Sequence, residues 1–243
     1  MSSERRGSYG MDAPGPFTMI ALVGLGNLVL AVFTRSIGPF VGGLFPLMVV
    51  AIAVHTSRRG KFLVWRDVLD GLRLTGNERV LDLGCGRGAV LMAAADRLTG
   101  GRAVGVDIWR RVDQSGNAAD ATRANARIEN VADRVLLVTG DMTALPFDSG
   151  SFDLITSNVA IHNIKGADGR RRALEEAVRV LRPGGRLALA DLRDTDRQVK
   201  RLAALGMLDV ERHNLGWRMW WGGPWAPTRL VTATKPVVKH SGA

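Results

Sequence analysis

Cysteine is almost absent from this chain of 243 residues, in which Cys85 stands alone. A single thiol excludes an intramolecular disulfide framework and any zinc site built on several thiolates, and we predict no metal site. Tyrosine also occurs only once, and aromatic residues make up 6% of the sequence. The interleaved aromatic and basic side chains that bind single-stranded RNA are therefore largely missing.

Acidic residues are outnumbered, with 23 Asp and Glu against 33 Lys and Arg, which gives a formal net charge of +10 and a pI near 11.0. This balance suits a nucleic-acid binder or a protein that lies against anionic lipid. The arginines are scattered along the chain, so solvated faces in an arginine-rich composition explain the charge equally well. A nucleic-acid partner is not favoured.

Two stretches lack charge altogether: residues 17–33 read FTMIALVGLGNLVLAVF and residues 37–54 read IGPFVGGLFPLMVVAIAV. At ~1.5 Å per residue, stretches of this length just suffice to cross a hydrocarbon core of ~30 Å. Only Thr34-Arg35-Ser36 separates them. We therefore predict a tail over 1–16 and a transmembrane helical hairpin over 17–55, with membrane contact through 17–54.

Basic residues flank the two ends of the hairpin more than its tip. The flanking residues are Arg5, Arg6, Arg58, Arg59 and Lys61, against Arg35 at the tip. By the positive-inside rule both ends lie in the cytoplasm, which places a catalytic domain on the cytoplasmic side of the membrane. A cleaved signal peptide, a re-entrant or interfacial arrangement and a soluble apolar cap are the alternatives. Four glycines would allow close helix packing in lipid: Gly24, Gly26, Gly42 and Gly43.

Apolar residues then recur at helical spacing within 56–76, with charged residues between them: Phe62, Trp65, Val68, Leu69 and Leu72. We predict an amphipathic linker helix that packs on the domain behind it. A role in roofing an active site or in resting on the membrane is the alternative.

Short apolar strands alternate with helical stretches from 77 to 236, before a short tail over 237–243. This alternation predicts an α/β domain with a parallel sheet covered on both faces. We expect strands at 79–83, 103–106, 135–139, 154–157 and 186–191, and helices at 89–98, 117–130 and 170–181. Ligands of such sheets bind beyond the carboxyl ends of the strands.

A glycine loop follows the first of these strands, where Gly84, Gly86 and Gly88 open a helix. Glycine lets a ligand approach bare backbone beside a helix N-terminus, and dinucleotides use such loops too. Asp82 distinguishes a dinucleotide from S-adenosylmethionine (SAM) as the ligand. A carboxylate before the loop repels a pyrophosphate, whereas it attracts the cationic sulfonium and ammonium groups of SAM. A nicotinamide-dependent oxidoreductase or a non-catalytic nucleotide-binding domain is the alternative.

Two further acids follow strands. Asp107 ends the second strand about twenty residues beyond the loop, where a carboxylate can accept both ribose hydroxyls of either ligand. Asp141 follows the third strand. Each alone could be a helix cap or turn residue, but together with Asp82 they favour a nucleoside site.

These segments resemble the class I SAM-dependent methyltransferases, in the branch of ubiquinone-biosynthesis and sterol-type small-molecule enzymes. The resemblance rests on VLDLGCGRG, GVDI, GDMTALPF, FDLITSNVAIHNI and RVLRPGGRLALAD, which together span roughly 78–192. It implies a Rossmann-like, seven-stranded, mostly parallel sheet with the last strand reversed, and SAM across its carboxyl edge. The residues that it assigns to the cofactor are Asp82, Gly84, Cys85, Gly86, Asp107, Ile108, Asp141, Met142 and Asn158. Among them, Asp107 would hold the ribose, Ile108 and Met142 the adenine faces, and Asp141 the adenine amino group.

Two features outside the cofactor motifs bear on the methyl acceptor: His162 after the fourth strand and a tryptophan-rich loop near the C-terminus. His162 follows the fourth strand, where a general base or an acceptor-orienting group is expected; capping of the next helix is the alternative. The Asn/Asp-Pro-Pro-aromatic run of enzymes that methylate nucleobase amines is missing there. Four tryptophans crowd into 216–226, a loop suited to a lid over an apolar acceptor, to an anchor at headgroup level, or to plain packing: Trp217, Trp220, Trp221 and Trp225.

We therefore predict a SAM-dependent methyltransferase that acts at the membrane on a small, lipophilic or amphipathic acceptor, such as a lipid. An RNA or protein methyltransferase is the second hypothesis and rests on the net charge alone. Oligomeric state and the atom that is methylated do not follow from the sequence.

Overall fold

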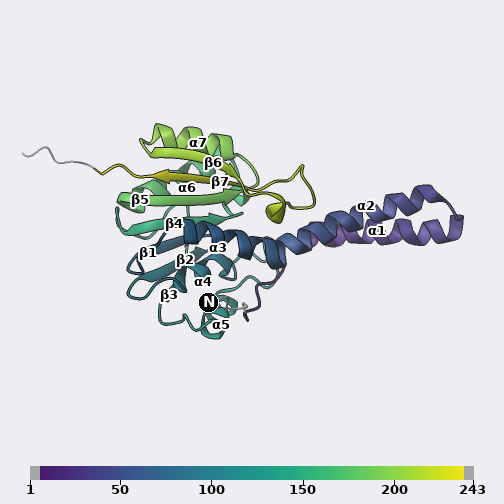
Figure 1. The fold of residues 1–243 in the computed structure, drawn as a ribbon, viewed down its shortest axis with the longest axis horizontal. Coiled ribbons are helices and arrows are strands. Elements are labelled where there is room, and N and C mark those ends of the chain that lie inside the picture. The colour runs from purple at the N-terminus through teal and green to yellow at the C-terminus, as the bar shows by residue number, and fades with distance from the viewer. Residues whose placement is uncertain (1–5, 238–243) are drawn as a thin grey trace, which may run out of the picture.

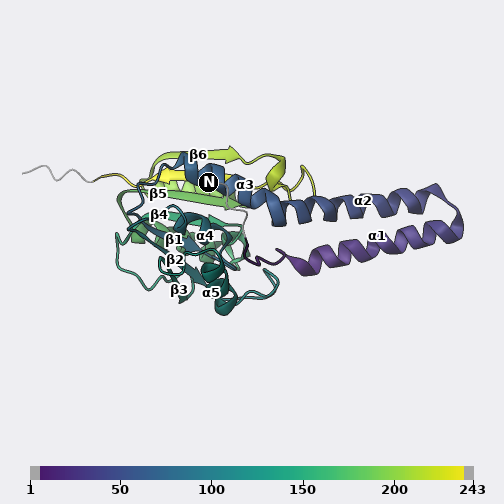
Figure 2. The ribbon, with the colours of Figure 1, turned by 60° about the horizontal axis from the view of Figure 1, so that its bottom comes forward.

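The computed structural model describes residues 6–237, which form a long helical hairpin projecting from an α/β domain (Figures 1 and 2). Arg5, the rest of 1–5 and residues 238–243 lie outside the described residues, so the flanking charge at Arg5 and most of the predicted tail 237–243 are not addressed.

The domain is built on a seven-stranded sheet with the order β3-β2-β1-β4-β5-β7-β6. Strands β1 to β5 run parallel, whereas β7 is antiparallel to both β5 and β6. This confirms the predicted Rossmann-like fold with its reversed last strand. The strands are β1 Arg79–Leu83, β2 Arg102–Asp107, β3 Val135–Thr139, β4 Phe152–Asn158, β5 Leu181–Asp191, β6 Leu208–Asn214 and β7 Arg229–Thr234.

Helices cover both faces of this sheet, as the pattern predicted. Along β1, Val80 packs with the cluster on one face, whereas Leu81 and Leu83 pack on the other, the period of two expected of a strand. The first face carries α3 Lys61–Gly71, α4 Ala89–Ala95 and α5 Ala119–Ile128. The second carries α6 Ala167–Val180 and α7 Thr195–Ala204.

The predicted hairpin consists of α1 Pro14–Thr34 and α2 Ile37–His55, joined by a tight turn in which Arg35 has φ of 50°. The two helices approach closely at two of the four glycines. A Cβ on Gly43 would lie 2.8 Å from the carbonyl oxygen of Gly24, and one on Gly24 would lie 2.9 Å from Cγ of Leu47. Gly26 faces open space, so only part of the glycine set serves helix packing.

The hairpin is not separated from the linker helix. A π-helical turn, Thr56–Gly60, joins α2 to α3, so that one uninterrupted helix runs over Ile37–Gly71. The turn is buried on one side, where Thr56, Ser57 and Gly60 pack against the tryptophan loop, residues 216–226, and the N-terminal segment. The hairpin is thereby held to the domain by continuous backbone.

The stretch predicted as a tail contains a segment, residues 7–13, that we call the strap. Its backbone bonds to α5 and to the loop after β2: the amide of Ser8 donates to Oδ1 of Asn125 at 2.9 Å, and the amide of Ala13 donates to the carbonyl of Asp113 at 3.0 Å. Tyr9 is 7% exposed and donates its hydroxyl proton to Glu129. The strap therefore crosses the domain before the chain enters α1.

Gly60 offers a test of how firmly the hairpin is docked. Alanine normally stabilises a helix by about 1 kcal/mol over glycine, but a Cβ on Gly60 would lie 1.8 Å from the carbonyl oxygen of Arg218. We expect Gly60→Ala to lower the melting temperature by several degrees, because such overpacking costs about 1–3 kcal/mol. Gly71→Ala, in the same helix with nothing within 4 Å, should leave it unchanged or higher. Equal melting temperatures for the two variants would contradict this packing.

Candidate functional site

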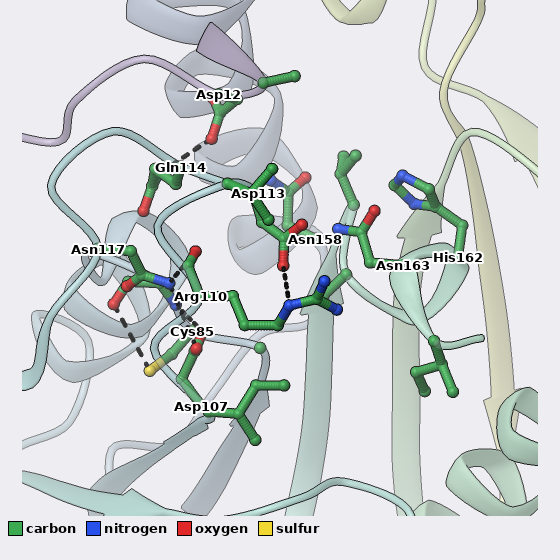
Figure 3. Close-up of a pocket in the computed structure, with 18 of the residues that line it drawn as sticks. Asp12, Cys85, Asp107, Arg110, Asp113, Gln114, Asn117, Asn158, His162 and Asn163 are labelled. Carbon is green, nitrogen blue, oxygen red and sulfur yellow. Dashed lines mark hydrogen bonds and ion pairs between the residues drawn. The ribbon is translucent and has the colours of Figure 1, made fainter. Parts of the chain in front are cut away.

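A cavity of about 580 Å³ lies at the carboxyl ends of the parallel strands. Figure 3 shows Asp107 and Cys85 toward one end of it, and His162 and Asn163 toward the other. All ten residues that the sequence predicted for the site line this cavity: Asp82, Gly84, Cys85, Gly86, Asp107, Ile108, Asp141, Met142, Asn158 and His162. The structure thus brings the predicted set together, while the role of each residue stays a prediction.

The glycine loop forms the floor of the cavity. Gly84 and Gly86 adopt φ of +67° and +51°, which side-chain-bearing residues rarely adopt. A Cβ on Gly84 would lie 2.3 Å from that of Ala160 in the loop after β4. Cys85, between them, is 7% exposed, and its burial raises the pKa of the thiol well above its usual value. Cys85 is therefore a packed, protonated side chain and not a reactive thiolate.

Asp107 is fixed at the end of β2 by three donors. Its Oδ2 accepts the amide of Gly86 at 2.8 Å, and its Oδ1 accepts the amide of Trp109 at 2.6 Å and Nδ2 of Asn117 at 3.3 Å. Burial raises the pKa of Asp107, although the hydrogen bonds from Gly86 and Trp109 oppose the shift. A carboxylate offers about four acceptor positions, so at least one remains for a ligand hydroxyl.

Asp82 lies deeper and is 2% exposed. Burial raises its pKa to about 7; the hydrogen bond that Thr156 donates at 2.8 Å lowers it, and the charge of Asp107 raises it further. A buried carboxylate beside an open cavity is electrostatically unsatisfied when ionised, and a cationic ligand group would relieve this cost.

The third acid and the two apolar residues stand at the rim. Asp141 is exposed, and its Oδ1 accepts the amide of Thr143 at 2.8 Å. Ile108 is 53% exposed and Met142 is half-buried, although both are apolar and line the cavity. Apolar side chains left open beside a carboxylate suit the faces and the amino edge of an adenine ring.

His162 forms a dyad with Asp191, which the sequence analysis did not single out. The Nδ1 atom of His162 lies 2.5 Å from Oδ1 of Asp191, and the backbone amide of His162 donates to Oδ2 at 3.1 Å. Asp191 ends β5 and is 1% exposed. When Nδ1 donates to this carboxylate, Nε2 carries the lone pair, so the histidine is oriented as a proton acceptor. The signal in the sequence was an acid closing the fifth strand.

A second polar group that the sequence analysis missed joins the strap to the hairpin. Asp12 accepts from Nζ of Lys61 at 2.6 Å, from the hydroxyl of Ser57 at 2.7 Å and from Nε2 of Gln114 at 2.9 Å. Asp12, Lys61 and Gln114 all line the cavity. They come from three segments distant in sequence, so no local pattern could have assembled them.

The charges of the cavity suit SAM and not a pyrophosphate. Two of its three basic side chains, Lys61 and Arg110, are already paired with Asp12 and Asp113. Of the charged groups that line the cavity, this leaves Asp82, Asp107 and Asp141 without a basic partner, and Lys165 as the one remaining basic side chain of the lining. The lining is therefore anionic overall, which favours a ligand that carries sulfonium and ammonium groups and disfavours a dinucleotide.

Comparisons with known proteins agree with this geometry. Residues 81–189 match the family model described as a methyltransferase domain. The chain is 31% identical over 144 residues to the ubiquinone/menaquinone biosynthesis C-methyltransferase UbiE of Ruegeria sp., an alignment that covers 59% of this chain and 51% of that protein. The chain spans about half the length of the curated relatives it matches.

Two solved structures share the fold. The [4+2]-cyclase SpnF superposes with a TM-score of 0.61 at 20% identity, over 74% of this chain and 84% of that one. A geranyl diphosphate methyltransferase in complex with GPP and sinefungin gives a TM-score of 0.58 at 17% identity, over 77% and 80%. At these identities the likeness shows the fold alone.

The fold and the family match together define an α/β methyltransferase domain whose cofactor is SAM. Residues 81–189 are thus a methyltransferase domain, and the chain is similar in sequence to curated small-molecule methyltransferases.

The raised pKa of Asp82 predicts pH-dependent cofactor binding. SAM brings positive charge to the ionised carboxylate, so its affinity should rise as the pH increases from about 6 to about 8. The folding stability of the cofactor-free chain should change in the opposite direction. The pKa of Asp82 is about 7 in the folded chain and 3.8 in an unfolded one, so between these pH values the folded chain binds more protons than the unfolded chain. Its free energy of unfolding therefore falls as the pH rises through this range. Titration calorimetry at stepped pH measures the first effect. Asp82→Asn should flatten the profile, and an unchanged slope would contradict the assignment.

Proposed function

We propose that this chain is a membrane-anchored methyltransferase that transfers the methyl group of SAM to a small, lipophilic or amphipathic acceptor, with the catalytic domain on the cytoplasmic side. The observation that supports it most directly is one cavity shared by the cofactor residues, the His162–Asp191 dyad and the base of the apolar hairpin. The relatives act on small molecules by their names, which supports the same acceptor class.

SAM supplies a methyl carbon already activated by the sulfonium. The chain's contribution is alignment, exclusion of water and removal of a proton. Asp82 would hold the methionine end beside the glycine loop, and Asp107 would accept from the ribose. At the opposite end, Nε2 of His162 would take the proton that the acceptor's hydroxyl or acidic C–H loses, and Asp191 would stabilise the resulting imidazolium.

The hairpin carries the membrane part of the proposal. Both helices are long and apolar enough to cross a membrane, by length and composition. Large apolar side chains are exposed along both, as is Arg35 at the tip. They are Met19, Leu22, Val23, Leu25, Val29, Leu30, Val32 and Phe33 on α1, and Ile37, Phe40, Val41, Leu44, Phe45 and Met48 on α2. Burial of so large an apolar surface in lipid would remove it from water.

Charge at the base of the hairpin supports the orientation. Arg58 and Arg59 are exposed in the π-helical turn, where the helix meets the catalytic domain. Two tryptophans of the tryptophan loop contact α2 nearby. Trp217 is 58% exposed and stacks on His55, and Trp225 is 59% exposed and contacts Phe45. Arginine is enriched on the cytoplasmic side, which supports the orientation, and tryptophan is enriched at headgroup level on both sides, which supports membrane contact at this depth.

The membrane anchor is tested by extraction. The full chain should remain with membranes in alkaline carbonate. The double variant Val29→Lys, Leu44→Lys should be released into the soluble fraction, because each charge near the bilayer centre costs about 2.5–3.5 kcal/mol on insertion scales. Leu136→Lys, at a position 53% exposed on β3, is the matched control and should stay with the membrane. Release of the unaltered chain would contradict the anchor.

The activity itself is tested by incubating the protein with methyl-labelled SAM and an extract of membranes and metabolites, and by identifying the labelled product by mass. Label in a small molecule supports the proposal. Label only in RNA or protein would replace it with the second hypothesis, which no feature of the described residues favours beyond the net charge.

A further inference from the structure

The wall of the cavity opposite the glycine loop is not made by the methyltransferase domain alone. Pro16 and Phe17, in the first turn of α1, line the cavity together with Trp221 of the tryptophan loop. Val112, Ile164 and Leu192 complete an apolar lining around them. None of these six residues belongs to the predicted cofactor set, and we call them the apolar wall of the cavity.

This wall is held in place by contacts between the hairpin and the domain. The hydroxyl of Thr56 donates to the carbonyl of Trp220 at 2.5 Å. Val49 of α2 packs so closely on Gly222 that a Cβ on this glycine would lie 2.7 Å from Cγ1 of Val49. Trp221 is 8% exposed, and its indole donates to the hydroxyl of Thr228 at 3.0 Å. The aromatic wall is therefore a fixed surface of the folded chain.

The apolar wall lies at the base of the hairpin, whose exposed surface is also apolar. Phe17 lines the cavity from the first turn of α1, and the same helix carries exposed apolar side chains beyond it, beginning with Met19 at 62% exposure. In the tryptophan loop, Trp221 lines the cavity, while the ring of Trp225 lies 5.8 Å from that of Phe45, which is 53% exposed on α2. The two elements that make the wall therefore also reach the apolar surface that would lie in lipid.

We propose that the base of the hairpin forms the acceptor subsite, and that the acceptor is a lipid whose reactive head enters the cavity between the first turn of α1 and the tryptophan loop while its apolar tail stays along the hairpin. This inference rests on the proposed function. The lipid head faces the His162–Asp191 dyad, and Phe17 and Trp221 contact the first apolar groups behind it. The hairpin is then part of the binding site and not only an anchor.

The chemistry of the cavity bears on the head group. Of the three basic side chains that line it, Lys61 and Arg110 are already paired with carboxylates, which leaves Lys165 beside Ile164 of the apolar wall. A compact head with a hydroxyl or an acidic C–H fits both the apolar wall and the proton acceptor.

The test uses the full chain in phosphatidylcholine nanodiscs, methyl-labelled SAM, and a total lipid extract from membranes of the cells that make the protein. We expect the label in the organic phase. Phe17→Ala should raise the KM for the extract by about tenfold to a hundredfold, the loss expected for an aromatic contact of this size, with SAM affinity unchanged. Leu136→Ala, on β3 and 53% exposed, lies away from the hairpin, is the matched control and should leave KM unchanged.

Trp221→Phe provides a second, milder change at the same wall, and keeps the proposal testable should Phe17→Ala fold poorly. Normal KM in both variants, with label transfer intact, would overturn the subsite and leave the methyltransferase proposal standing. Label only in water-soluble products would overturn the lipid acceptor. Absence of any transfer by the unaltered chain would overturn the proposed function and this inference with it.

Discussion

Replacing Asp107 with alanine is expected to weaken SAM binding by about tenfold to a hundredfold, because a hydrogen bond to a charged group contributes about 1.5–3 kcal/mol and Asp107 has an acceptor position left for a ribose hydroxyl. Titration calorimetry measures the affinity directly, and the SAM-induced rise in melting temperature should vanish. An unaltered affinity would remove Asp107 from the site.

Asp107 also accepts the amides of Gly86 and Trp109, so its loss could loosen the loop itself. The melting temperature of the ligand-free variant measures this loosening apart from the loss of SAM affinity. Asp107→Asn keeps the shape and one acceptor oxygen, but its amide nitrogen cannot accept the second backbone amide, so it should lower the melting temperature less than alanine does and still bind SAM weakly. Asp120→Ala, at a carboxylate that is 94% exposed on α5, is the control for a general effect of charge and should change nothing.

Removal of His162 is expected to have the second large effect. His162→Ala should lower turnover by about 10²–10⁴-fold, the usual contribution of a general base, while SAM affinity stays as it was. Single-turnover transfer of labelled methyl, alongside calorimetry, distinguishes the two quantities. His213→Ala, at an exposed histidine on β6 that pairs only with Glu211, should remain fully active.

Asp191 supplies a readout that a merely structural role would not change. Asp191→Asn keeps the shape of the side chain but replaces one acceptor oxygen with a donor and removes the charge that stabilises an imidazolium, so turnover should fall and the pH–rate profile should move. Full activity of His162→Ala would exclude the dyad from the mechanism. In that case the contact at 2.5 Å would be a structural bond that fixes the loop after β4.

Much of the domain could be predicted because its signals are local. The bounds of β1 and β3 follow directly from short apolar runs between polar residues. The site residues lie immediately after strands, and parallel strands bring such positions to one edge, which explains why all ten line one cavity. The presence of β6 and β7 and the reversal of the last strand came only from the family resemblance, since β6 is largely exposed and lacks an apolar pattern. The order of these two strands was not predicted.

What the sequence did not predict depends on contacts between distant segments. Asp12, Lys61 and Gln114 meet only because the strap, the helix after the hairpin and the loop after β2 converge. The partnership of His162 with Asp191 requires the pairing of β4 with β5. Nor does the composition of 56–60 reveal a π-helical turn, because that depends on how many residues fit between two docked ends and not on their propensities.

The π-helical turn also fixes the rotational phase between anchor and catalyst. A π-turn holds about one residue more than an α-turn, and each residue of an α-helix advances it by about 100°, so winding Thr56–Gly60 as regular α-helix would turn α2 by about that angle relative to α3. Because α1 packs along α2, it would swing around the same axis and carry Phe17 off the cavity wall. Both bodies would keep their own cores. A single peptide unit thus decides whether the membrane part and the catalytic part face the same ligand.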